Sequence, residues 1–162
     1  MIIIIKYRKE CRKDGNIHII SEEENSCPVC VGVLIVIGSR KRKVINNEGN
    51  EETLVIRRMR CKGCRKIHHE LPDMIIPYKR HCAETIEKII NEDTTDVCCD
   101  FATEYRLKAW WATILLYFER AKASLQMKYG LIFPGKVTPG EIIRAIANTN
   151  LWIHTRTAMT HI

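Results

Sequence analysis

The chain has 162 residues, a length that fits one domain or two small ones. Hydrophobic residues make up 46% and charged residues 28%, so the composition is that of a folded protein and excludes wholesale disorder. The formal net charge of +7 favours an anionic partner such as nucleic acid or an acidic membrane surface. Because no apolar run approaches the ~20 residues of a membrane span, we expect a cytoplasmic protein that does not cross a membrane.

The chain divides into three parts. Residues 1–26 open with an apolar run and are predicted to form an N-terminal strand and linker. Residues 27–76 are predicted to form a zinc ribbon, and residues 77–162 a helical domain. The predicted fold class is therefore α+β: an N-terminal ribbon, built from one β-hairpin and a four-cysteine zinc site, followed by an all-helical segment with one long helix.

Two CxxC pairs carry the strongest signal in the chain. They are Cys27 with Cys30 and Cys61 with Cys64. We expect no export signal, and in a cytosolic protein this pattern indicates a metal site before a disulfide framework. Four thiolates suit tetrahedral Zn²⁺, and four protein ligands leave no open position for water or substrate. The sequence therefore predicts one structural zinc ion.

Two other metal arrangements were weighed against this one. The tripeptide from His68 to Glu70 has the H-x-E form of zinc deaminases, but both cysteine pairs precede it, which is the wrong order for that motif. A second metal site could be imagined at His81, Cys82, Cys98 and Cys99. Free cysteine is more often a small buried residue, and we favour that interpretation for the three cysteines.

The segment between the two pairs is predicted to be a basic β-hairpin. Residues 33–37 and 53–56 are β-branched runs, and residues 46–50 are a polar turn with Gly49. Residues 27–70 hold ten basic and four acidic side chains, so they carry +6 of the total charge. Such clustering favours contact with phosphates. The expected contacts are Arg40, Lys41, Arg42, Lys43, Arg57, Arg58, Arg60, Lys62, Arg65 and Lys66.

The clearest periodicity lies in a predicted helix at about 102–129. Its apolar residues recur every three or four positions, and Gly130 follows as a helix-ending residue. This spacing favours a core-facing stripe over a base-stacking surface. The stripe consists of Leu107, Trp111, Ile114, Phe118, Ala121 and Leu125, with Trp110 and Tyr117 on its flanks.

Shorter helices are predicted on either side of the long one. Isoleucine spacing indicates a helix over 79–91, and Thr138 with Glu141 forms a capping box for a helix that begins at Pro139. The first of these and the start of the long helix are predicted to form a helix-turn-helix-like unit. Its expected nucleic-acid contacts are Thr103, Arg106 and Lys108. The chain ends in a predicted extended or irregular tail that contains Trp152, His154 and Arg156.

Residues 27–82 resemble the N-terminal zinc ribbon of bacterial insertion-sequence transposases, through the motifs CPVC, RRMRCKGC and HHELP. His69 stands where that ribbon usually has an aromatic residue. The longer run 27–156, through TEYRLKAWW and LWIHTR, is similar to an uncharacterised bacterial family associated with mobile elements. That family couples such a ribbon to a helix-turn-helix-like segment. It opens the helix of the double tryptophan with Ser-Thr, where this chain has Ala102 and Thr103.

The function predicted from these features is nucleic-acid binding, with DNA the expected partner, by a transposon-associated or regulatory accessory factor. A transposase or another mobile-element protein is a second expected partner, and no small-molecule substrate is expected. A transposase-type nuclease needs a strand-rich core after the ribbon, whereas the remaining segment is predicted to be helical and too short, so we expect no enzyme. The alternatives are a protein-interaction adaptor with a purely structural ribbon, and a fragment or remnant of a transposase.

Overall fold

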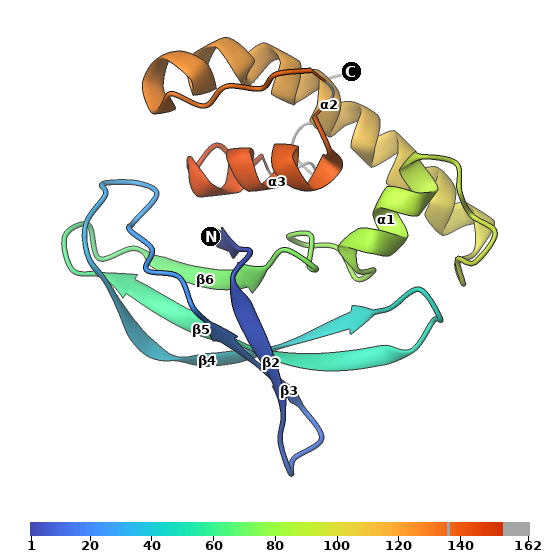
Figure 1. The fold of residues 1–162 in the computed structure, drawn as a ribbon, viewed down its shortest axis with the longest axis horizontal. Helices are drawn as coiled ribbons and strands as arrows, with labels where there is room; N and C mark the ends of the chain where they lie inside the picture. The colour runs from blue at the N-terminus through green and yellow to red at the C-terminus, as the bar shows by residue number, and fades with distance from the viewer. Residues whose placement is uncertain (136, 154–162) are drawn as a thin grey trace.

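The computed structural model describes residues 1–135 and 137–153. In this part of the chain, six strands form a curled mixed sheet, and the three helices lie on one side of it (Figure 1). The strands are β1 (Ile2–Ile4), β2 (Tyr7–Cys11), β3 (Ile17–Ser21), β4 (Leu34–Ile45), β5 (Glu51–Cys61) and β6 (Ile67–Pro72). The helices are α1 (Ala83–Ile90), α2 (Phe101–Tyr129) and α3 (Pro139–Asn148).

Strand β5 is the centre of the sheet, whose order is β1-β6-β5-β3-β2 with β4 also paired to β5. Strand β4 runs antiparallel along the whole of β5. The other edge of β5 is shared, since β6 pairs antiparallel at Arg58–Arg60 and β3 pairs parallel at Leu54 and Val55. Because two strands leave the same edge of β5, the sheet splits and curls (Figure 1).

The predicted fold class, a separate ribbon followed by an all-helical segment, is wrong. The N-terminal residues contribute three strands, and β1 pairs in parallel with β6 from Ile2 opposite Glu70 to Ile4 opposite Pro72. All three isoleucines of β1 are buried in the same hydrophobic core as α1, α2 and α3. Sequence periodicity reports only local structure, whereas parallel pairing joins residues far apart in the chain. Strands and helices therefore share one core.

The predicted hairpin is present but longer than expected. Strand β4 runs on through the basic residues 40–43 to Ile45, after a shift in register at Gly38. This bulge lets the strand resume pairing beyond the β-branched run. The predicted turn follows, where the Asn46 side chain accepts hydrogen bonds from the backbone amides of Glu48 and Asn50.

Helix α1 is shorter than predicted. It begins at Ala83 rather than at residue 79, because His81 bridges to Ile45 at the end of β4 and Cys82 bridges to Ile75. The ten residues 91–100 then separate α1 from α2. A helix-turn-helix joins its helices by a turn of about three to four residues. The structure therefore does not build the predicted helix-turn-helix.

On helix α2, Trp110 rather than Trp111 faces the core. Trp110 is 3% exposed and packs with the buried Leu107 and Ile114, whereas Trp111 is only half-buried. The predicted assignment of Trp111 to the core and Trp110 to the flank is thus reversed. A spacing of three then four residues from Leu107 fits the helical repeat as well as the reverse order, so periodicity alone did not separate the two rings.

Helix α3 begins as predicted. Thr138 is its N-cap, the Thr138 hydroxyl accepts from the Glu141 amide, and the Glu141 carboxylate accepts from the Thr138 amide. The predicted tail lies partly outside the described residues, since His154 and Arg156 are beyond residue 153. Among the described residues, no helix is both long and apolar enough to cross a membrane.

Candidate functional site

The two CxxC pairs form a matched pair of tight backbone turns. In each turn, the residue after the second cysteine adopts a left-handed conformation, with φ 59° at Val31 and 62° at Arg65. The Val31 amide donates to the Cys27 carbonyl at 2.8 Å, and the Arg65 amide donates to the Cys61 carbonyl at 3.2 Å. The Lys62 amide donates to the carbonyl of Val33, which ties the second turn to the first.

These turns bring the four predicted cysteine sulfurs together. The Sγ atoms of Cys27 and Cys64 are 3.6 Å apart, those of Cys30 and Cys61 are 3.4 Å apart, and all four lie within 4.8 Å of one another. A tetrahedral ion with bonds of about 2.3 Å to sulfur needs sulfurs about 3.8 Å apart. The cluster could therefore hold one metal ion. Within residues 1–135 and 137–153 it is the only such group of His, Cys, Asp and Glu.

The pKa values of two cluster thiols move in opposite directions. Hydrogen bonds, first from the Gly32 backbone amide and then from Cys61, lower the pKa of Cys30 to about 6. Against a backbone hydrogen bond from Lys66, burial and the contacts with the other three sulfurs raise the pKa of Cys64 to about 11. Cys30 is therefore the thiol that ionises first, and the thiolate is the form that binds metal. Gly32 also allows the close approach of the two turns, because a Cβ atom there would lie 3.0 Å from Cys61 Sγ. These contacts match a metal centre made of sulfur.

His68, the first residue of the H-x-E tripeptide, contacts this centre. Its side chain is buried, and its Nε2 lies 3.3 Å from Cys27 Sγ. Burial is the first cause that lowers the pKa of His68, to about 4, so the ring is neutral at pH 7. In the tautomer that carries hydrogen on Nε2, His68 donates to the Cys27 sulfur and orients that ligand.

Glu70, the other end of the H-x-E tripeptide, is a structural residue. Its carboxylate is buried and accepts two hydrogen bonds from Arg57, at 2.6 Å from Nε and 2.9 Å from the terminal nitrogen. Asn25, just before the first cysteine turn, donates to the same carboxylate. Side chains two apart on a strand share a face, so His68 and Glu70 point the same way and His69 points the opposite way. This alternation along the strand is the sequence signal that could have predicted His68 beside the cysteines and Glu70 beside Arg57.

The basic residues of the hairpin are divided between the two faces of the sheet. Arg40 lies opposite Ile56, Arg42 opposite Leu54, and Arg58 opposite both Gly38 and His69. Directly paired residues share a face and alternate residues share a face, so Arg40, Arg42, Arg58 and His69 lie on one side. We call this side the arginine face. The opposite face carries Lys41, Lys43 and Arg57.

Two adjoining hollows lie on the arginine face and share Arg40 and His69 as lining residues. The first, of about 150 Å³, is lined by Met1, Arg40, Arg42, Ile56, His69, Leu71, Pro77 and Tyr78. The second, of about 450 Å³, is lined by Ser39, Arg40, Arg58, Ile67 and His69. No Asp or Glu among the described residues lines either hollow. Burial first, then Arg40 and Arg58, lowers the pKa of His69, so the local potential is positive.

Several predicted nucleic-acid contacts already have partners within the chain. Lys43 pairs with Glu51 at 2.6 Å, and Lys108 pairs with Glu92 at 3.6 Å. The Thr103 hydroxyl and amide both donate to the Asp100 side chain, which caps α2. Arg57 is paired with Glu70, and Arg42 donates to the Lys79 carbonyl at 2.7 Å. Other members are more accessible. Arg106 is exposed on α2, and the exposed residues beside the cysteine cluster are Arg60, Lys62, Arg65 and Lys66.

The other cysteines stand apart from the cluster. Cys82 is buried at the N-cap of α1, as predicted, and its sulfur lies 3.1 Å from the Thr85 hydroxyl. The burial prediction is wrong for Cys98, which is exposed in the loop before α2, while Cys99 is half-buried. Because residues 91–100 form a surface connection rather than a helix, Cys98 does not face the core.

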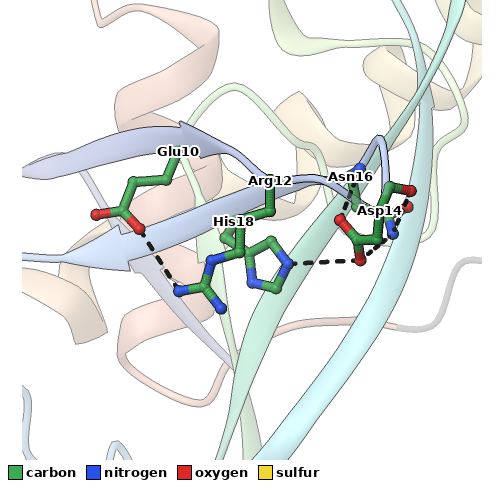
Figure 2. Close-up of polar contacts among 5 residues, drawn as sticks. All are labelled: Glu10, Arg12, Asp14, Asn16 and His18. Carbon is green, nitrogen blue, oxygen red and sulfur yellow. Dashed lines mark hydrogen bonds and ion pairs between the residues drawn. The ribbon is translucent and has the colours of Figure 1, made fainter.

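A further polar cluster closes the β2–β3 hairpin (Figure 2). The carboxylate of Asp14 accepts hydrogen bonds from the amide and side chain of Asn16, and these bonds lower the pKa of Asp14. His18 Nε2 lies 3.8 Å from the same carboxylate, and Glu10 accepts a long hydrogen bond from Arg12. His18 Nε2 is buried and has no hydrogen-bond partner among the described residues. The bonds between Asp14 and Asn16 close the turn and stabilise the hairpin.

A comparison with protein-family models matches residues 27–110 to DUF6431, a domain of unknown function. The chain belongs to this family. The DUF6431 match begins at the first clustered cysteine and ends at Trp110, so it contains all four sulfurs, the arginine face and the start of α2. Searches of curated proteins and of solved structures found no match.

Proposed function

We propose that this protein binds nucleic acid, with DNA as its target, through the arginine face, and that a structural zinc ion holds this face together. The observation that carries the proposal is the pair of adjoining hollows, lined by Arg40, Arg42, Arg58 and His69 and by no described acidic residue. Phosphate contact by clustered arginines supplies most of the affinity of proteins that bind nucleic acid without sequence preference.

Zinc is the metal that best suits the cluster. Four thiolates in a tetrahedral arrangement favour Zn²⁺, and a fully protein-ligated ion has a structural role. Cys61 ends β5, and Cys64 lies in the turn that leads to β6. An ion bound there would fix the β5–β6 connection and thus the relative positions of Arg58 and His69, which pair across these strands.

The chemistry of the hollows suits a phosphodiester chain. Guanidinium groups donate in a planar fork that matches phosphate oxygens, and neutral His69 can add one further donor. Tyr78, 63% exposed, lines the first hollow and stacks against Trp152 with ring centroids 6.3 Å apart.

The proposal includes no catalytic site of the protein's own, and an accessory role in a mobile element rests on the transposase-like sequence motifs. A transposase would then be the protein that supplies catalysis. The adaptor function becomes the preferred account if the arginine face shows no affinity for nucleic acid.

Binding across a salt series tests the proposal. We expect the purified protein to bind duplex DNA at low salt, and the logarithm of affinity to fall linearly with that of salt concentration. Three or four phosphate contacts give a slope of about −3 to −4, because each contributes about −0.9. Fluorescence anisotropy with labelled duplex DNA, single-stranded DNA and double-stranded RNA measures the slope and ranks the targets. Absence of binding to all three at low salt would overturn the proposal, and tighter binding to RNA would reassign its target.

A further inference from the structure

Helix α2 has a second apolar stripe, on the side opposite to its core-facing residues. The members of this outer stripe are Phe101, Tyr105, Ala112, Leu116, Ala123 and Met127. All six are exposed, with exposed fractions of 82% for Phe101, 69% for Tyr105, 55% for Leu116 and 81% for Met127. At 3.6 residues per turn they fall on one side of the helix. Lys108 and Glu119 stand at the edge of this row, at the levels between its apolar members. A folded domain seldom leaves such a row of large apolar side chains uncovered.

The outer stripe is symmetric in sequence about Ile114. Phe101 and Met127 are equidistant from that residue, as are Tyr105 and Ala123, and Ala112 and Leu116. A two-fold axis at the level of Ile114 would therefore place each member opposite its counterpart on a second, antiparallel helix. A large residue would meet a small one at two of the three levels, Tyr105 against Ala123 and Leu116 against Ala112. Such alternation lets helices approach closely.

Charges beside the outer stripe follow the same symmetry. Glu104 lies ten residues before Ile114, and Lys122 lies eight residues after it. Lys108 lies six residues before Ile114, and Glu119 lies five residues after it. All four lie on the same flank of the stripe, where an antiparallel two-fold pairing brings like flanks together. Each of these four charges would thus meet one of opposite sign, whereas on the other flank Arg106 and Arg120 would face each other as like charges. Within the chain, Lys108 makes only an exposed pair with Glu92, a contact of small energy.

We propose that α2 is a homodimer interface, in which the outer stripe packs against the outer stripe of a second copy in antiparallel orientation. A two-fold contact uses one patch twice and so requires a self-complementary surface, which the apolar levels and the charges of the flank that carries Glu104 provide. This inference does not depend on nucleic-acid binding, because the outer stripe and the arginine face lie on different elements.

Sedimentation velocity of the nuclease-treated full chain over a range of concentrations tests the proposal. We expect a concentration-dependent dimer. Leu116→Arg should raise the dissociation constant of the dimer by at least ~100-fold, because each of the two copies loses one apolar side chain from the interface. Ile132→Arg is the matched control, because Ile132 is 75% exposed but lies outside the stripe. The control should dimerise normally, and circular dichroism should show that both variants are folded.

A charge swap tests the antiparallel arrangement itself. Glu119→Lys alone and Lys108→Glu alone should each weaken the dimer roughly tenfold at low salt, because each places like charges together at two symmetric positions. The double swap should restore it. A monomer at all concentrations, a dimer insensitive to Leu116→Arg, or a double swap no tighter than the single variants would overturn the proposal.

Discussion

Replacing Cys61 by Ser is expected to abolish metal binding and to unfold both cysteine turns. Cys61 is fully buried, ends β5 and faces the other three sulfurs. In small metal units the binding free energy is also folding free energy, about 10–16 kcal/mol for structural zinc in isolated peptides. Elemental analysis should give about one zinc per chain for the wild type and none for the variant. Loss of structure should appear as hydrogen exchange at the Val31 and Arg65 amides, which close the two turns.

Cys11→Ser is the matched control for this change. Cys11 is exposed on β2 and does not belong to the cluster. The control should keep its zinc and its protected amides. A Cys61→Ser protein with full metal content, or one that is metal-free but retains protected turns, would contradict the structural role assigned to the metal.

Trp110→Ala is expected to lower the free energy of unfolding by about 3–5 kcal/mol, the usual cost of truncating a buried large side chain. Trp110 is 3% exposed, and the ammonium group of Lys79 lies 4.1 Å from its ring centroid. Trp111→Ala provides an internal comparison, since the neighbouring ring is only half-buried and should cost clearly less. Urea denaturation of the two variants measures the difference. Equal losses, or a larger loss for Trp111→Ala, would contradict the orientation of α2.

Much of the site could be predicted from local sequence. A CxxC spacing confines two sulfurs to one turn. A polar turn between two β-branched runs predicts a hairpin, and a hairpin places Cys27 close to Cys61. The capping box at Thr138 depends on four consecutive residues and was predicted for the same reason. Each of these features is decided by residues near one another in the chain.

The errors arose where distant residues decide the outcome. The parallel pairing of β1 with β6 joins Ile2 to Glu70, and no local pattern encodes it. The basic residues 40–43 lie beyond the predicted β-branched run 33–37, but β4 continues through them and sends alternate side chains to opposite faces. The buried pair of Arg57 with Glu70 likewise depends on how β5 meets β6.

Comparison of two double variants tests the assignment of nucleic-acid binding to the arginine face most directly. Arg40→Gln with Arg58→Gln alters the arginine face, and Lys41→Gln with Lys43→Gln alters the opposite face of the same hairpin. Both remove two positive charges, so their long-range electrostatic effects are matched. Binding to duplex DNA across a salt series should show a slope flatter by about 2 for the arginine-face variant and an unchanged slope for the other. Equal effects of the two, or a larger effect of the lysine variant, would contradict the account.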